Sequence, residues 1–423
     1  MKFLKHIIFF VLISGTTMSV SAQNKSDNNL LEDLLKQHRK IFDSVLAKKN
    51  ELNIQIIYTQ IQRKKKDAGK KDKIKLTDYS FNIHPDRYYY PASTVKLPVA
   101  ILALQKLNEL KIAGLDRNTT MITLAGAEGQ TTVNNDSSAI DGRPTIAYYI
   151  KKILLVSDND AFNRLYEFLG QEYINNSMHK MGFTDAEIIH RLQISLSEEQ
   201  NRLTNPVRFI DNKGNVIYEK PLEKSKLVYA ARNTKLGNGY MRGNELIKEP
   251  FDFSKKNRLP LTDLHAILKS VLFPGAVPTK QRFNLTEDDY AFLRKYMSML
   301  PRESATPVYD SATYGDSYVK FLYYGAEKST ANPDIRIFNK PGDAYGFMID
   351  AAYIIDYKNN IEFMVSAIIY CNSDGIFNDD TYDYEKVGLP FLKNLGRVLY
   401  DYELKRKNKH SVDLSALRLQ YTK

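Results

Sequence analysis

The 423-residue chain has a single cysteine, Cys371, and only seven histidines scattered along its length. One cysteine cannot form an internal disulfide, and the chain has no cluster of cysteines and histidines at metal-ligand spacing. It also lacks a His-Glu-x-x-His sequence, a Gly-rich loop ending in Gly-Lys-Ser/Thr and a Gly-x-Ser-x-Gly elbow. These absences argue against zinc hydrolases, nucleotide-binding proteins and elbow-type serine hydrolases. We expect neither a metal nor a cofactor.

Long apolar runs are missing too, except at the N-terminus. Lys2 and Lys5 precede an apolar stretch from Ile7 to about Val20, and the small residues Val20-Ser21-Ala22 follow. This order predicts a secretory signal peptide, residues 1–22, and the run is short for a membrane span. We therefore expect a periplasmic or secreted protein with no stable membrane insertion and no lipid anchor. An uncleaved N-terminal anchor is the alternative interpretation.

The formal net charge is +11, and it becomes +9 when Lys2 and Lys5 leave with the signal peptide. Much of the excess lies between residues 64 and 75, where seven lysines surround Gly69 between two strand-like segments. This composition predicts a solvated hairpin tip. The tip has no interleaved aromatics and no recognition helix, so nucleic-acid binding is not expected. A loose attraction to anionic envelope surfaces stays open.

The hydrophobic pattern predicts strands near both ends of the chain and helices between them. Residues 23–50 have apolar positions near helical spacing, and strand-like segments flank the lysine-rich tip. The later expected elements are a buried helix at 94–110, helices within 144–170, a hairpin at 209–218, helices at 261–272 and 287–300, strands at 335–339, 347–355 and 362–370, and a helix at about 384–404. The terminal strands can pair only in one antiparallel sheet, with the helical middle packed against it. A site is expected at that seam.

The tetrapeptide Ser-x-x-Lys occurs three times, at Ser93/Lys96, Ser177/Lys180 and Ser317/Lys320. Only Ser93 follows an extended Pro-Ala pair and opens an apolar helix, whose free N–H groups and dipole favour negative charge. Lys96 lies one turn further on the same face, and burial would lower its affinity for a proton. A neutral lysine can accept the proton of a serine nucleophile. Ser93 and Lys96 are therefore the candidate pair, and the other two pairs are interpreted as surface residues.

Two more short motifs contain groups suited to acyl transfer. In Ser157-Asp158-Asn159, Ser157 can relay a proton and Asn159 can contact a substrate amide, although a helix cap is an alternative. In the segment that begins Lys340-Pro341-Gly342, Lys340 can hold a carboxylate and Gly342 allows close backbone approach. The N–H groups of Ser93 and Asp343 could form an oxyanion hole. An ordinary strand-end turn is the alternative for this segment.

Taken in this order, the motifs resemble the class A branch of the superfamily of β-lactamases and penicillin-binding proteins. The matching segments are Pro91-Ala92-Ser93-Thr94-Val95-Lys96-Leu97-Pro98, Ser157-Asp158-Asn159 and Lys340-Pro341-Gly342-Asp343-Ala344-Tyr345-Gly346. The resemblance covers about residues 54–404. It implies an α+β fold (an α/β sandwich) with a five-stranded antiparallel sheet, flanking helices and a helical subdomain. It also implies catalytic roles for Ser93, Lys96 and Ser157, with substrate contacts from Asn159, Lys340, Gly342 and Asp343.

Two departures from the family pattern stand out. Family β-lactamases have a loop glutamate that activates the deacylating water, and alignment on Arg191-Leu192 puts that position on Leu196. Glu198 or Glu199 can substitute only if the loop runs differently. The second departure is Pro341, where the family usually has a threonine or serine hydroxyl. Residues 205–258 also look like an insertion relative to the family.

The sequence thus predicts an amphipathic helix at 23–50, a serine hydrolase domain at 51–410 and a tail at 411–423, after the signal peptide. The expected substrates are β-lactams or D-alanyl cell-wall peptides that acylate Ser93. Two alternatives stay open: an esterase on another acyl substrate, and a binding or sensing module that stays acylated or performs no chemistry. The oligomeric state is left undetermined.

Overall fold

A computed structural model describes residues 29–64, 73–406, 414 and 417–421 of the chain. The signal-peptide prediction for 1–22, most of the lysine-rich tip and most of the predicted tail lie outside these residues. Among the helices in these ranges, none has the length and apolar character needed to cross a membrane.

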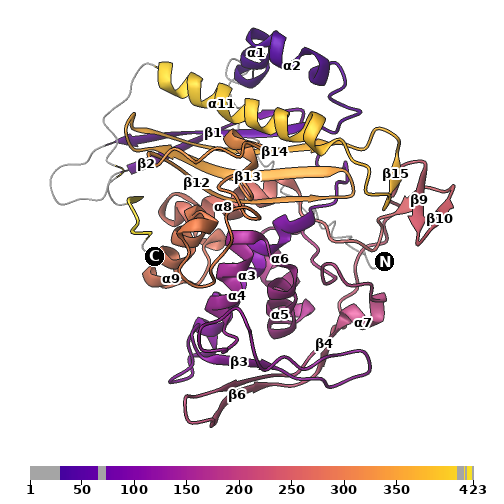
Figure 1. Cartoon of the computed structure of the whole chain (residues 1–423), viewed down its shortest axis with the longest axis vertical. Coiled ribbons are helices and arrows are strands. Elements are labelled where there is room, and N and C mark those ends of the chain that lie inside the picture. Colours follow the sequence, from indigo (N-terminus) through magenta and orange to yellow (C-terminus); the bar gives the residue numbers. More distant parts are fainter. Residues whose placement is uncertain (1–28, 65–72, 407–413, 415–416, 422–423) are drawn as a thin grey trace, which may run out of the picture.

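The centre of the fold is a five-stranded antiparallel sheet made from both ends of the chain (Figure 1). The strand order is β12-β13-β14-β1-β2. The strands are β1 (Gln55–Lys64), β2 (Lys73–Phe81), β12 (Ile335–Ala344), β13 (Phe347–Asp356) and β14 (Ile361–Tyr370). The two chain ends meet where β1 pairs with β14, with Tyr58 opposite Val365. The expected α+β fold with this sheet is confirmed.

Helices cover both faces of the sheet. One face carries α11 (Leu389–Lys405), with α1 (Leu30–Gln37) and α2 (Arg39–Leu46) beside it. The other face carries α8 (Leu261–Leu272), α9 (Glu287–Ser298) and α3 (Lys96–Leu110), so the two faces bury separate apolar clusters. The single helix expected at 23–50 is wrong, because the chain leaves helical geometry at His38, where φ is −103° and ψ is 37°.

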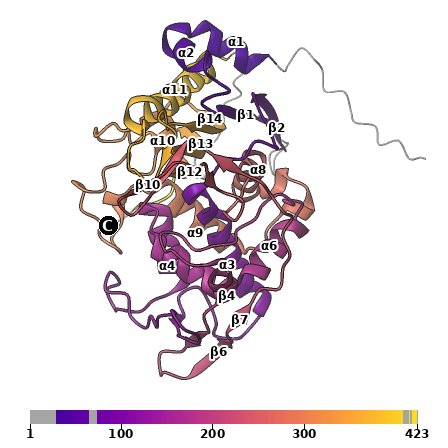
Figure 2. The same cartoon turned by 90° about the vertical axis from the view of Figure 1, so that its right-hand side faces the viewer.

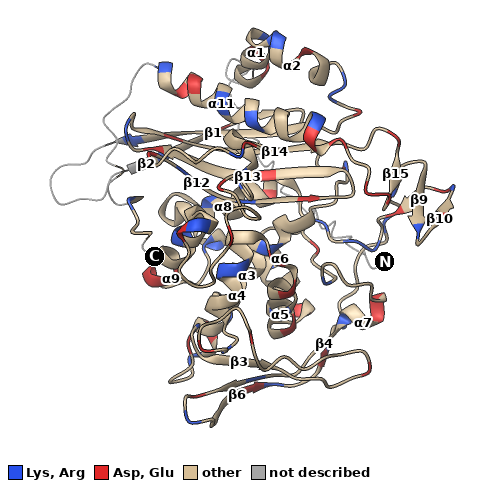
Figure 3. Cartoon of the chain, in the orientation of Figure 1, with Lys and Arg blue, Asp and Glu red and all other residues tan. Residues whose placement is uncertain are grey.

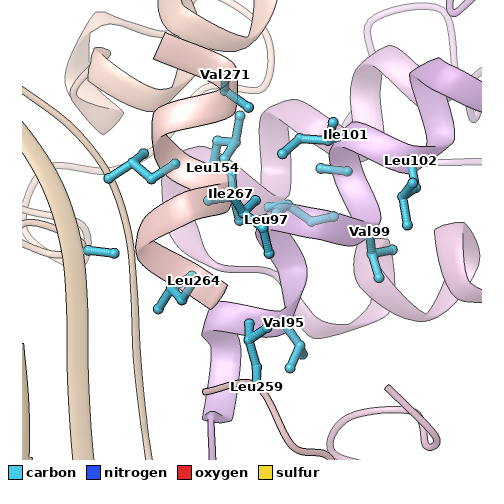
Figure 4. Packing of buried hydrophobic residues seen from close by; sticks show 14 of the residues in the cluster. Val95, Leu97, Val99, Ile101, Leu102, Leu154, Leu259, Leu264, Ile267 and Val271 are labelled. Atoms are coloured by element: carbon cyan, nitrogen blue, oxygen red, sulfur yellow. The ribbon is translucent and has the colours of Figure 1, made fainter. Parts of the chain in front are cut away.

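The helical region lies on the side of the sheet opposite α11, as the turned view also shows (Figure 2). It contains α4 (Ile146–Val156), α5 (Asn159–Leu169) and α6 (Gln171–Lys180) around α3. Side chains of α3 such as Leu97 and Ile101 pack with Leu154 of α4 and Ile267 of α8 (Figure 4). Full burial of each such side chain contributes about 1.5–3 kcal/mol. This packing holds the N-terminal end of α3 between the sheet and the helical region.

Short strands and helices complete the described structure. A three-stranded sheet below the helices contains β3 (Thr120–Thr123), β5 (Val207–Ile210) and β6 (Val216–Lys220), and its β5–β6 pair is the hairpin expected at 209–218. At one end of the molecule, β9 (Gly239–Arg242) pairs with β10 (Glu245–Ile247) and with β15 (Ile376–Phe377). The other short elements are α7 (Glu198–Arg202), β4 (Leu203–Thr204), β7 (Glu223–Lys224), β8 (Lys235–Leu236), β11 (Phe251–Asp252) and α10 (Phe321–Tyr324). The β9–β15 pairing ties the 205–258 segment to the chain that follows β14.

Candidate active site

Ser93 lies in a short 3-10 turn, Ala92–Val95, that leads directly into α3. The hydroxyl of Thr94 stabilises this turn by donating to the Pro91 carbonyl at 2.6 Å. Strand β12 packs against the turn at Gly342, where a Cβ atom would lie 2.7 Å from the Ser93 nitrogen and 2.9 Å from the Thr94 nitrogen. Backbone atoms cannot yield as a flexible side chain can, so a glycine at this position is required for the close approach.

Lys96 is fully buried, and its amine lies among four oxygen atoms. Its Nζ donates to Ser93 Oγ at 2.8 Å, to the Ser157 carbonyl at 2.5 Å and to Asn159 Oδ1 at 2.6 Å, with Ser157 Oγ at 3.2 Å. Burial lowers the pKa of Lys96 well below its ordinary value, and the charge of Lys340 lowers it further. A neutral amine at this distance can accept the hydroxyl proton of Ser93.

Ser157 and Asn159 lie at a sharp junction between two helices. Ser157 ends α4 in the left-handed region, with φ +60°, and Asp158 caps α5 by accepting a hydrogen bond from Ala161 N at 2.7 Å. The helix-cap interpretation of this motif therefore applies to Asp158. Because Asp158 makes the cap, the side chains of Ser157 and Asn159 on either side of it can both reach Lys96.

Lys340 is the second buried lysine at this site. Its Nζ donates to Ser157 Oγ at 2.8 Å and to the Pro341 carbonyl at 2.7 Å, so Ser157 Oγ lies within hydrogen-bond reach of both lysines. Burial lowers the pKa of Lys340 to about 7, against the opposing charges of Asp350 and Asp343. Lys340 therefore changes its charge near neutral pH.

This pKa predicts how ligand binding depends on pH. Only the ammonium form of Lys340 attracts a substrate carboxylate, so the noncovalent affinity for an anionic ligand should fall as pH rises through about 7. The limiting loss is about tenfold per pH unit, the slope of a single titration. The measurement is the dissociation constant of a penicillin for Ser93→Ala, which cannot be acylated, between pH 6 and 9. Adding Lys340→Arg to this variant keeps the positive charge over the whole range and should flatten the fall, whereas a flat profile for Ser93→Ala alone would contradict the role of Lys340.

A buried polar network lies behind β12 and contains the third Ser-x-x-Lys lysine. Lys320 is 1% exposed, and its Nζ donates to Asn339 Oδ1 at 2.7 Å and to the Met297 carbonyl at 2.6 Å. Asn339 in turn donates to both carboxylate oxygens of Asp350, at 2.9 and 3.0 Å. The interpretation of Ser317/Lys320 as surface residues is therefore wrong for Lys320. The network supports the strand residue directly before Lys340.

The loop residue that reaches the site is Gln193, which none of the sequence motifs included. Asn159 Nδ2 donates to Gln193 Oε1 at 2.6 Å. The loop is anchored beside it, since Arg191 donates to Glu167 Oε2 at 2.9 Å inside the protein. Leu196, the expected position of the loop glutamate, has an apolar side chain that cannot act as a base. Gln193 directly follows Arg191-Leu192, and its side chain has the size and shape of glutamate. These two features of the sequence could have indicated Gln193 as the loop residue of the site.

The two nearby loop acids have other partners. Glu198 forms an ion pair with Arg202 at 3.1 Å, and Glu199 forms one with Lys224 at 2.6 Å. Within the described residues, neither glutamate forms a hydrogen bond or ion pair with Ser93 or Lys96, whereas Asn159 accepts from Lys96 and donates to Gln193. The loop therefore offers the site an amide at Gln193 where a hydrolytic β-lactamase would offer a carboxylate.

Asp343 follows Gly342 on β12 and completes the set of expected residues. Asp343 is an exposed residue of this strand. Partial desolvation by the surrounding protein raises the pKa of its carboxylate, while the charge of Lys340 opposes that rise. The structure thus brings Ser93, Lys96, Ser157, Asn159 and Lys340 together, with Gly342 and Asp343 along the adjoining strand.

The structure places a serine beside a buried lysine at the seam between an antiparallel sheet and a helical region, which is the arrangement expected from the resemblance to β-lactamase-like serine hydrolases. Residues 38–217 match the model of the family described as the beta-lactamase enzyme family. The matched segment includes Ser93, Lys96, Ser157 and Asn159 and ends before β12. The chain is thus β-lactamase-like in fold and sequence.

Solved structures of β-lactamases and of PBP-A are similar to the chain at low identity. The class A β-lactamase from Clostridium kluyveri DSM 555 is 13% identical with a TM-score of 0.46, over 87% of this chain and 98% of that one. The acyl-enzyme complex of a PBP-A mutant with penicillin G is 14% identical with a TM-score of 0.45, over 88% and 96%. A search of curated proteins gives no significant match. Because these TM-scores are below 0.5, the likeness to β-lactamases rests on the family match over residues 38–217.

Proposed function

We propose that the protein is an exported serine hydrolase whose Ser93 is acylated by β-lactams or D-alanyl cell-wall peptides. The observation that carries this proposal is the 2.8 Å separation between Lys96 Nζ and Ser93 Oγ, in surroundings that favour the neutral amine. Lys96 takes the hydroxyl proton as Ser93 Oγ attacks the carbonyl carbon. The N–H groups of Ser93 and Asp343 stabilise the oxyanion that develops.

The remaining groups deliver the proton and hold the substrate. As the C–N bond breaks, Ser157 passes a proton to the leaving nitrogen and receives one from Lys96, whose Nζ lies 3.2 Å from Ser157 Oγ. Lys340 in its ammonium form binds the substrate carboxylate, and Asn159 contacts the substrate amide. Export, with a periplasmic or secreted location, rests on the sequence of residues 1–22.

A second candidate function is a module that stays acylated, and Gln193 favours it. The carboxamide of Gln193 next to Asn159 cannot act as a general base toward water. Without such a base, hydrolysis of the Ser93 ester would be slow. The protein would then be a slow cell-wall peptidase or a β-lactam sensor and not an efficient β-lactamase.

Intact-protein mass spectrometry tests the proposal. Residues 23–423 are mixed with benzylpenicillin over a time course, with Ser93→Ala in parallel. We expect an adduct of the mass of the drug on the wild type and none on Ser93→Ala, and we expect the adduct to persist for many minutes. Rapid loss of the adduct with accumulation of hydrolysed drug would instead indicate a β-lactamase. If no adduct forms at any time, the acylation proposal fails.

A further inference from the structure

A cavity of about 400 Å³ opens beside strand β12, just beyond Gly342. Its walls come from the end of β12 and from the segment after β15. The lining residues are Asp343, Ala344, Tyr345, Asn378, Asp380, Tyr382 and Tyr384. The lining thus contains two carboxylates and three tyrosine rings, and no lysine or arginine. Carboxylates and aromatic faces together are the chemistry that binds an ammonium group.

The two carboxylates of this cavity, Asp343 and Asp380, have no ion-pair partner among the residues that the structure describes. Residues 373–384 contain four aspartates and no basic residue, and acidic residues appear around β15 in Figure 3. Three of these aspartates accept hydrogen bonds from backbone N–H groups nearby, namely Asp374, Asp379 and Asp383. Within the part of the chain that the structure describes, neither Asp380 nor Asp343 forms an ion pair or a side-chain hydrogen bond. These two carboxylates can therefore form ion pairs with a positively charged ligand in the cavity.

The order of the site residues along β12 indicates which part of a substrate would reach this cavity. Lys340 would hold the substrate carboxylate, and Gly342 lies against the Ser93 nitrogen, where the reacting carbonyl would be. A strand rises about 3.3 Å per residue, so Ala344, the last residue of β12, lies about 13 Å beyond Lys340, and Tyr345 follows it in the turn to β13. The carboxylate of a penicillin or of a D-alanyl peptide belongs to the leaving part. The groups on the far side of the carbonyl, toward Asp343 and Tyr345, therefore belong to the acyl part.

We propose that this cavity is a subsite for a positively charged amino group on the acyl part of the substrate, an inference that rests on the proposed function. The ammonium group contacts the carboxylates of Asp343 and Asp380 and the rings of Tyr345 and Tyr382. The charge of Lys340 partly offsets that of Asp343. Asp380 lies on the other wall, which the segment after β15 forms. It is therefore the residue that determines the preference of the cavity for a positively charged group.

Three penicillins with closely related side chains test the subsite. Ampicillin has an α-ammonium group, benzylpenicillin has no charge at that carbon and carbenicillin has a carboxylate there. We expect the second-order rate constant for Ser93 acylation to fall in that order, by about 3- to 10-fold per step at low salt and a pH that protonates ampicillin. The differences should shrink as ionic strength rises, because exposed charges are screened.

Two aspartate variants in the same loop localise the effect. Asp380→Asn keeps the size of the side chain, and asparagine tolerates the φ of +59° at this position. It should remove most of the advantage of ampicillin and leave the rate with benzylpenicillin unchanged. Asp379→Asn is the matched control, because it removes the same charge from a carboxylate that bonds Thr381 N and does not line the cavity. The preference should survive in that variant.

Each other outcome has a distinct meaning. Equal acylation by the three penicillins, with a Ser93 adduct in each case, would overturn the subsite and leave the proposed function standing. A preference that Asp379→Asn removes as fully as Asp380→Asn would assign it to the overall charge of the loop and also overturn the subsite. No adduct with any penicillin would overturn both the proposed function and the subsite.

Discussion

Replacing Lys96 by alanine is expected to slow the acylation of Ser93 by a penicillin by about 10²- to 10⁴-fold. The reason is geometric and electrostatic. The Lys96 amine lies 2.8 Å from the Ser93 hydroxyl, and burial and the charge of Lys340 favour its neutral form, which can accept the proton. The measurement is the rate at which the drug adduct appears in intact-protein mass spectra. Circular dichroism establishes that the variant is folded.

Lys106→Ala is the matched control for this prediction. Lys106 lies on the same helix, and burial lowers its pKa to about 8, yet its Nζ donates to the carbonyls of Phe168 and Leu169 at 2.9 and 3.1 Å. Loss of this lysine should leave acylation within a few-fold of the wild type. If both variants slow the reaction equally, disturbance of α3 is the cause and the role of Lys96 as the base is contradicted.

Replacing Gln193 by glutamate is expected to shorten the lifetime of the acyl-enzyme by about 10²-fold or more. The substitution keeps the size and shape of the side chain and converts an amide into a carboxylate beside Asn159, whose Nδ2 already donates to this position at 2.6 Å. A carboxylate there can accept a proton from a water that attacks the Ser93 ester. The measurements are the decay of the adduct after removal of free drug and the steady-state rate of penicillin hydrolysis.

Leu196→Glu is the comparison that tests the loop register. It adds the same carboxylate three residues further along, at the position that alignment on the sequence alone had suggested. We expect it to leave the lifetime of the adduct nearly unchanged. If Leu196→Glu accelerates deacylation and Gln193→Glu does not, the loop approaches Ser93 differently in solution, and the assignment of Gln193 to this position fails.

The elements and the sheet were largely predictable, because they follow from local periodicity and from strands at both ends of the chain. The break between α1 and α2 was not, since residues 23–50 keep apolar positions near helical spacing on both sides of His38. Lys320 was misjudged for a related reason. Its tetrapeptide resembles an ordinary surface segment, and only the packing of Asn339 and Met297 around it shows that it is buried.

The sequence by itself determined the class of the protein and its candidate nucleophile. Ser93 and Lys96 are one helical turn apart, and that proximity is a property of a short segment that can be seen without the fold. Only the tertiary structure decided that Ser157 lies between two lysines, that Gln193 reaches Asn159 and that Asp343 and Asp380 line one cavity. These residues come from segments far apart in the chain. Their distances depend on how the sheet, the helices and the loops pack together, which the order of motifs along a sequence does not specify.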